Sequence, residues 1–85
     1  MRADIGERVG AIHSADSTTV NFFGYGVYQG YHPYAPFGDD YIIQNPRILL
    51  DSGEHVYGAQ CWWGKEDEIK RRIGDRKVVM VEVEK

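Results

Sequence analysis

The segment TTVNFFGYGVYQGY, residues 18–31, mixes Val, Thr and aromatic side chains with glycine and contains no charged residue. β-Branched and aromatic residues favour strands because they pack well on a pleated, half-buried surface. The segment therefore predicts a long stretch of β structure. Gly24 and Gly26 predict a bulge or a sharp bend within it, since glycine in a strand often marks such irregularities.

The sequence around this segment predicts further strands joined by polar turns. These strands are expected over residues 6–14, 47–51, 55–63 and 76–84. A helix is predicted over 65–73, because acidic residues occupy its first turn, basic residues occupy its last turn, and Gly74 follows it. We therefore expect a single domain, 1–85, of mainly β (α+β) class. The expected architecture is a small twisted SH3-like barrel of about six strands with one short helix before the last strand.

Residues 31–46 contain all three prolines of the chain and predict a long loop rich in proline and aromatic residues. Tyr31, Tyr34 and Phe37 recur there at every third position. A polyproline II helix has three residues per turn, so these rings would line one edge of an extended arm.

Composition and charge exclude several classes of protein. The formal net charge of −3 argues against a broad basic face for duplex DNA. The single cysteine, Cys61, cannot form an internal disulfide and favours a reducing, cytoplasmic location. The sequence shows neither a signal peptide nor an apolar run long enough to span a membrane. A chain this short has a thin core, so we expect a homo-oligomer.

The aromatic residues have two competing interpretations. Most rings in a small β domain belong to its core, but Tyr and Trp are also enriched at binding surfaces. Alternation along 55–63 places Trp63 with the core-facing residues and Trp62, beside Gln60, on the other face. We expect at least two rings to form a binding surface. The candidate ligand-binding residues are Tyr25, Tyr28, Tyr31, Tyr34, Phe37, Arg47, Gln60, Trp62 and Arg71.

The two arginines in this set are candidates for an anionic group of the ligand. Arg47 follows the predicted loop and is able to pair with a phosphate. Arg71 belongs to a basic cluster formed by Lys70, Arg71, Arg72, Arg76 and Lys77. The ordinary role of such a cluster is to compensate the helix dipole on a solvated surface, and an anion site is the alternative.

The sequence carries no catalytic, metal or cofactor signature. Cys61 and the histidines, His13, His32 and His55, form no local nucleophile–base or zinc-ligand pattern. The Gly-Tyr-Gly element lacks the strand–turn–helix context of a dinucleotide site, and no phosphate-binding loop is present. We therefore expect a protein that is not an enzyme and uses neither metal nor cofactor.

Four elements together, GERVGAI (6–12), FFGYGVYQG (22–30), NPRILLDSG (45–53) and CWWG (61–64), resemble a pattern found in short uncharacterised phage and prophage proteins. The resemblance implies a context and no site residues. Small phage proteins of this kind often inhibit or sequester host components in the host cytoplasm, and some bind nucleotide immune signals.

Three functions follow as hypotheses. The first is a non-enzymatic phage-type protein that holds, and by holding sequesters as a host-defence antagonist, a flat nucleotide-like ligand by means of aromatic rings and a basic residue. The second is an SH3-like protein-interaction module or an inhibitor that binds a host protein. The third is single-stranded nucleic-acid binding, which the negative net charge weakens.

Overall fold

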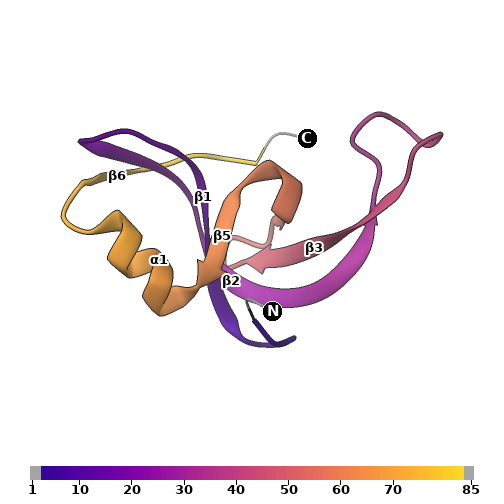
Figure 1. Cartoon of the computed structure of the whole chain (residues 1–85), viewed down its shortest axis with the longest axis horizontal. Helices are drawn as coiled ribbons and strands as arrows, with labels where there is room; N and C mark the ends of the chain where they lie inside the picture. The colour runs from indigo at the N-terminus through magenta and orange to yellow at the C-terminus, as the bar shows by residue number, and fades with distance from the viewer. Residues whose placement is uncertain (1–2, 84–85) are drawn as a thin grey trace.

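Strand β2 (Thr19–Tyr34) organises the fold in the computed structural model, which describes residues 3–83 (Figure 1). On one side β2 pairs antiparallel with β1 (Arg8–Ala15). On its other side, its first half pairs in parallel with β6 (Lys77–Met80) and its second half pairs antiparallel with β3 (Ile43–Leu50). The long strand predicted from the 18–31 segment is therefore present and extends three residues further, to Tyr34.

A β-bulge in β2 allows this one strand to pair with neighbours in both halves of the sheet. The register of β1 and β2 shifts where Ala11 pairs with Gly24 and Ile12 pairs with Phe22, so that Phe23 is passed over. Gly24 takes a φ of +132°, a conformation that other residues rarely adopt. At Gly26 a Cβ would lie 2.7 Å from Leu50 Cα, so the absence of a side chain permits the close approach of β2 and β3. The bend predicted at these glycines is confirmed.

The remaining elements complete an open sheet of order β4-β3-β2-β1-β5. They are β4 (His55–Tyr57), the 3₁₀ helix η1 (Gly58–Gln60), β5 (Trp62–Lys65) and the helix α1 (Glu66–Ile73), which precedes β6. The mainly β class with six strands and one helix before the last strand is confirmed. Within residues 3–83 no ladder joins β4 to β5, so the sheet does not close into the expected barrel.

The strand expected over 55–63 is interrupted by the 3₁₀ helix η1, and the same interruption keeps the sheet open. Its first part ends at Tyr57, and Gly58–Gln60 turn away as η1 before the chain re-enters the sheet as β5. The side chain of Gln60 accepts a hydrogen bond from the backbone N–H of Tyr57 at 2.9 Å, which holds this turn closed. Since β4 is only three residues long, it offers a short edge that β5 does not reach.

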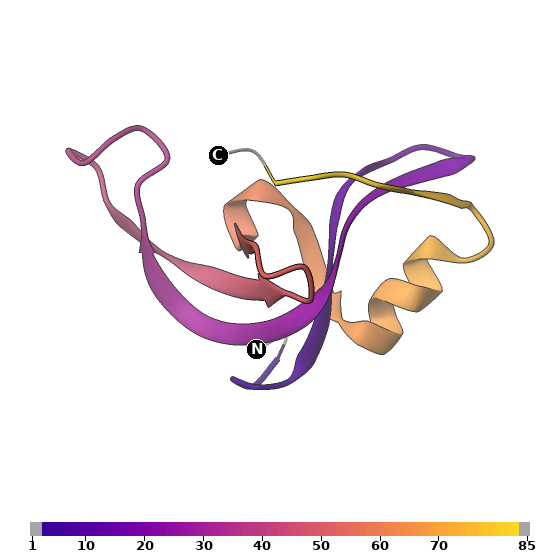
Figure 2. The ribbon, with the colours of Figure 1, turned by 180° about the vertical axis from the view of Figure 1, so that it is seen from behind.

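The loop expected over 31–46 is shorter than predicted. Tyr31 to Tyr34 belong to β2 and pair with Pro46 to Ile43 of β3, so only residues 35–42 are irregular. Prolines are tolerated here because, beyond Val27, β2 has no β1 partner and the two strands form a ribbon with a free edge. This ribbon, with its connecting loop (residues 29–46), projects from the body of the molecule, and we call it the arm (Figure 2). The expected polyproline arm is therefore wrong.

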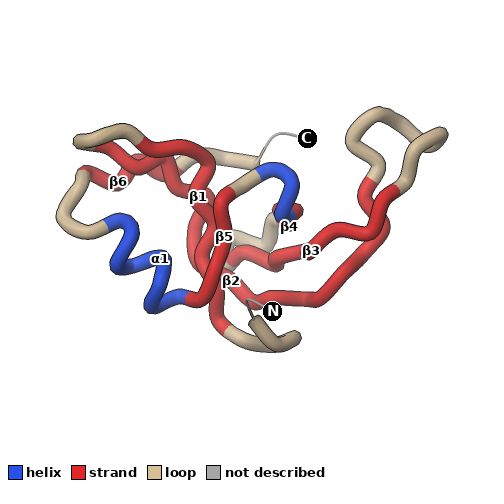
Figure 3. Tube along the Cα trace, in the orientation of Figure 1, coloured by secondary structure: helices blue, strands red, loops and turns tan. Residues whose placement is uncertain are grey.

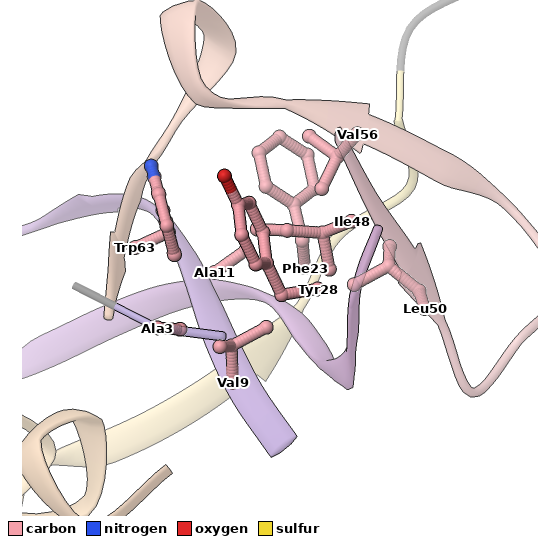
Figure 4. Close-up of a cluster of buried hydrophobic side chains, with 9 residues drawn as sticks. All are labelled: Ala3, Val9, Ala11, Phe23, Tyr28, Ile48, Leu50, Val56 and Trp63. Atoms are coloured by element: carbon pink, nitrogen blue, oxygen red, sulfur yellow. The ribbon is translucent and has the colours of Figure 1, made fainter. Parts of the chain in front are cut away.

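Two apolar clusters lie on opposite faces of the sheet. The larger is drawn in Figure 4 and is formed by Ala3, Val9, Ala11, Phe23, Tyr28, Ile48, Leu50, Val56 and Trp63. The smaller joins Ile12, Val20 and Phe22 to Ile69 and Ile73 of α1, which lies beside β1 and β5 (Figure 3). Adjacent Phe22 and Phe23 are both buried because each face of the sheet carries one of these clusters, Phe22 in the smaller and Phe23 in the larger. In the part of the chain that is described, no helix is long and apolar enough to cross a bilayer.

Candidate functional site

A groove of about 570 Å³ lies where the base of the arm faces β5 and the side of α1. We call it the aromatic groove. Its lining comes from six parts of the chain, which are Ala3 before β1, β2, β3, η1 with the following residue, β5 and α1. The side chains used in the argument are Tyr28, Tyr31, Asn45, Pro46, Trp62, Trp63, Glu68 and Arg72.

The floor of the groove is a rigid pair of rings. Tyr28 and Trp63 stack with centroids 5.0 Å apart and planes 17° from parallel, and both are buried (Figure 4). The backbone of Tyr28 is fixed on both sides, because its carbonyl accepts a bond from Gly6 N–H at 2.8 Å and its N–H donates to Glu7 at 3.0 Å. Burial raises the pKa of the Tyr28 hydroxyl, so it stays protonated at neutral pH.

The rim of the groove carries two exposed rings. Trp62 is 69% exposed and Tyr31 is 62% exposed. Trp62 differs from its neighbour Trp63 because successive side chains of β5 point to opposite faces, with Trp63 paired to Ala11 and Trp62 to Ile12. Within residues 3–83 neither exposed ring is paired with another aromatic ring, so each is available to stack on a flat ligand.

One end of the groove is polar. Arg72 Nε lies 3.5 Å from Glu68 Oε1 across one turn of α1, and both side chains are about half exposed. Such an exposed pair holds each partner weakly, so Arg72 can turn to a ligand anion at small cost. Asn45 contributes a second polar group, whose Oδ1 accepts a bond from Ala59 N–H at 2.8 Å. That bond fixes the amide and leaves its nitrogen as a donor.

Three of the nine side chains singled out in the sequence, Tyr28, Tyr31 and Trp62, meet in the aromatic groove. Two of the other tyrosines are engaged elsewhere. Tyr25 packs edge-to-face on Phe22 at 4.9 Å on the helix side of the sheet, with Lys70 Nζ 5.8 Å from its ring centroid. Tyr34 stacks on Tyr57 with centroids 4.4 Å apart.

The remaining four candidates do not line the groove. Phe37 is 85% exposed in the loop at the tip of the arm. Arg47 Nε donates to Gln29 Oε1 at 2.7 Å, which ties β3 to β2 inside the arm. Gln60 is committed to the turn of η1. Arg71 lines a separate surface pocket of charged side chains, together with Arg8 and Lys65.

Sequence reasoning did not single out Asn45 or Pro46, and it named Arg72 only as a member of the basic cluster. Helical spacing contained the signal for Arg72, because it lies three residues after the buried Ile69 and one before the buried Ile73. It therefore flanks the face of α1 that meets the sheet, whereas Arg71, two residues after Ile69, points elsewhere. Asn45 and Pro46 carried no such signal, since the sequence assigned them to an irregular loop.

Three of the groups considered for catalysis or metal binding, His13, His32 and Cys61, have structural partners. His13 Nδ1 lies 2.9 Å from Ser14 Oγ, His32 Nε2 lies 2.9 Å from the carbonyl of Gln29, and Cys61 Sγ donates to the carbonyl of Tyr57 at 3.4 Å. Among residues 3–83, no three His, Cys, Asp or Glu side chains converge as metal ligands would.

No protein-family model matches this chain, and comparisons with curated proteins and with solved structures find no significant match.

Proposed function

We propose that this protein is a non-enzymatic binding protein that holds a flat, nucleotide-like ligand in the aromatic groove. The observation that carries the proposal is that two exposed rings, Tyr31 and Trp62, border the same groove as the Arg72 guanidinium. Stacking on an aromatic side chain contributes roughly 1–3 kcal/mol per base. A charge-assisted hydrogen bond from arginine to a phosphate oxygen would add to this and orient the ligand.

The charge of the groove limits the ligand to a small anion. Glu68 lies beside Arg72, so this end of the groove carries one positive and one negative side chain. The whole chain has a net charge of −3, which disfavours long polyphosphates and single-stranded nucleic acid. A nucleoside with one phosphate fits this balance best. Asn45 would then donate a hydrogen bond to a carbonyl or ring nitrogen of the base.

Binding without turnover is the mode of action that we propose. No activated nucleophile faces the groove among the described residues, because the Cys61 thiol, which lines it, is bonded to the carbonyl of Tyr57. Together with the resemblance to short phage proteins, the engagement of the Cys61 thiol supports a role in sequestering a host nucleotide signal in the cytoplasm.

A second candidate function is docking of an extended, proline-containing peptide, as in an interaction module of SH3 type. Pro46 lines the groove together with Tyr31 and Trp62, and aromatic-lined grooves are the sites that bind polyproline segments. The half-exposed carboxylate of Glu68 would pair with a basic residue flanking such a peptide. This function needs no closed barrel, only the groove.

Isothermal titration of the purified chain with adenosine monophosphate tests the nucleotide proposal, after native mass spectrometry has established whether a ligand copurifies. We expect binding that Trp62→Ala weakens at least tenfold, equivalent to about 1.4 kcal/mol, without loss of the fold. Phe37→Ala removes an even more exposed ring outside the groove and is the matched control. Equal losses in both variants would contradict the proposal.

Replacement of arginine separates stacking from charge recognition. Arg72→Gln is expected to weaken the binding of adenosine monophosphate several-fold and to leave the binding of adenosine unchanged, because only the phosphate contacts the guanidinium. Arg71→Gln, one residue away on another face of α1, is the control and should change neither. If a proline-rich peptide binds and both adenosine ligands do not, the peptide-docking function replaces the nucleotide one.

A further inference from the structure

A second pocket, of about 440 Å³, opens between β2, the turn that follows β3, the end of α1 and β6. We call it the β6 pocket. Its walls are mostly apolar side chains, among them Phe22, Tyr25, Ile73, Val78 and Met80. Among residues 3–83 it shares no lining residue with the aromatic groove. It is therefore a candidate site of its own.

A glycine and a methionine leave space in the β6 pocket. Gly24 lies at the β-bulge of β2, and a Cβ at this position would lie 3.6 Å from Met80 Cε. The Met80 side chain is 63% exposed, and an unbranched thioether changes its rotamer at little cost. In contrast, Phe22 and Tyr25 hold each other edge-to-face with centroids 4.9 Å apart. The pocket thus combines a fixed aromatic wall with an adaptable one.

The register of β6 decides which of its side chains reach the pocket. Met80 pairs with Phe22, and Val79 pairs with Asn21. Paired residues of neighbouring strands lie on the same face of a sheet, and successive residues alternate between faces. Val78 and Met80 therefore share the face of Phe22 and line the pocket, whereas Val79 lies on the other face and does not.

The charges around the β6 pocket are already paired. Among its described lining residues only Asp51 is charged, and its carboxylate accepts two hydrogen bonds of 2.7 Å from Arg8. The Lys70 ammonium, 5.8 Å from the centroid of the Tyr25 ring, lies 3.6 Å from Glu66 Oε1. An ionic ligand would lose hydration here without gaining a free counter-charge, which is unfavourable. The pocket therefore suits an uncharged ligand.

The size of the pocket favours a small molecule over a protein partner. A cavity of about 150 Å³ accommodates benzene, and ligand pockets commonly measure about 300–1,000 Å³. The 440 Å³ of the β6 pocket falls within this range. A stable protein interface, in contrast, buries about 800 Å² on each partner, which a hollow bounded by four elements does not offer.

We propose that the β6 pocket binds an uncharged, apolar molecule of about two or three rings. The ligand would be held by burial of apolar surface against Phe22, Val78 and Met80. Hydrogen bonds and ion pairs would contribute little, since the charged groups around the pocket are engaged with one another. The proposal is independent of the nucleotide-like ligand proposed for the aromatic groove.

Fluorescence titration of the full chain with N-phenyl-1-naphthylamine tests the proposal, because this uncharged probe emits strongly only in apolar surroundings. We expect saturable binding to one site per chain. Val78→Glu places a carboxylate in the wall and should weaken binding about tenfold or more. Val79→Glu, which adds the same charge on the other face of β6, is the matched control and should change little. Absence of saturable binding, or equal losses in both variants, overturns the proposal.

Three further measurements keep the test decisive. If circular dichroism shows that Val78→Glu does not fold, Met80→Glu replaces it, since Met80 is already 63% exposed. The probe 8-anilinonaphthalene-1-sulfonate has the same rings with an added anion, and it should bind several-fold more weakly. Equal affinity for both probes would overturn the assignment to an uncharged ligand. Trp62→Ala should leave probe binding unchanged, and a loss there would place the probe in the aromatic groove and overturn the proposal.

Discussion

The two halves of β2 show how one strand supplies both core and surface. In the half from Val20 to Tyr28, the chain is hydrogen-bonded on both sides, to β1 or residues 6–7 on one side and to β6 or β3 on the other, and Val20, Phe22 and Tyr28 are at most 3% exposed. In the half from Gln29 to Tyr34, only β3 is paired, and Tyr31 is 62% exposed. Both halves carry aromatic residues, four in the first and two in the second. The number of flanking elements therefore decides whether a ring becomes core or remains available to a ligand.

The largest expected effect is that of Trp63→Ala in the body of the molecule. This variant removes the ring stacked on Tyr28 and leaves a cavity, which for a buried aromatic residue costs about 3–5 kcal/mol of unfolding free energy. Trp62→Ala, at the adjacent exposed position, should cost less than about 0.5 kcal/mol. Urea denaturation of both variants measures the contrast. Similar losses of unfolding free energy in the two variants would mean that Trp62 and Trp63 do not differ in burial as described.

The next effect concerns the contact between β2 and β3. Gly26→Ala would place a Cβ 2.7 Å from Leu50 Cα and in collision with the carbonyl oxygen of Leu49, so the strands must separate. We expect a loss of about 2–3 kcal/mol. Gly38→Ala in the arm meets no atom within 4 Å, but its φ of +99° strains alanine. Its expected cost is about 1 kcal/mol, and thermal unfolding should rank the two variants in this order.

A smaller effect is expected for the second stacked pair. Tyr34→Ala removes the ring whose centroid lies 4.4 Å from that of Tyr57. Tyr34 stands at the end of the β2–β3 ladder next to the connecting loop, and both residues are only half buried. The stack itself contributes about 0.5–1.5 kcal/mol. Because the arm has its own ladder, we expect hydrogen exchange to accelerate in residues 29–46 while exchange in the body stays the same. Uniform acceleration throughout the chain would show that the arm and the body unfold together.

The smallest expected effect is on the pH dependence of the stability of the molecule outside the arm. Arg8 donates two hydrogen bonds of 2.7 Å to the Asp51 carboxylate, and these bonds lower the pKa of Asp51. The stabilisation is complete above the unfolded-state pKa of about 3.9 and is lost as the pH falls through the lower folded-state pKa. Asp51→Asn should therefore reduce the loss of stability in acid. Asp39→Asn, in the arm, is the control for removal of one negative charge. Acid titration followed by circular dichroism compares the two variants with the wild-type chain.

The features predictable from the sequence were those encoded in neighbouring residues. The bend at Gly24 and Gly26, the helix before the last strand and the opposite environments of Trp62 and Trp63 all follow from local spacing. The extension of β2 to Tyr34 did not follow, because Pro33 and Pro36 suggest a break. Pairing with β3 overrides that local preference, since an edge ribbon has positions that require no N–H.

The groove was only partly predictable for a related reason. The sequence singled out Tyr28, Tyr31 and Trp62 as rings but could not show that residues of β2 and β5 face one another. The choice of Arg47 and Arg71 over Arg72 came from sequence proximity and charge alone. The structure directs Arg47 into the ribbon through Gln29, and the orientation of α1 brings Arg72 to the groove. Closure of the barrel likewise depends on the length of β4, which the 3₁₀ turn limits.

The parallel ladder between β2 and β6 also has a consequence for the order of folding. β1 and β2 meet across a turn of a few residues, closed by hydrogen bonds from Thr18 and Thr19 to the Asp16 carboxylate. The β6 ladder, in contrast, joins Thr19 to Lys77. Closing so long a loop costs more chain entropy, so β6 should dock late, on a sheet that already exists. Until then, the β6 segment and the edge of β2 that it covers are both unpaired, so this last step of folding is the one at which mispairing between incomplete chains is expected.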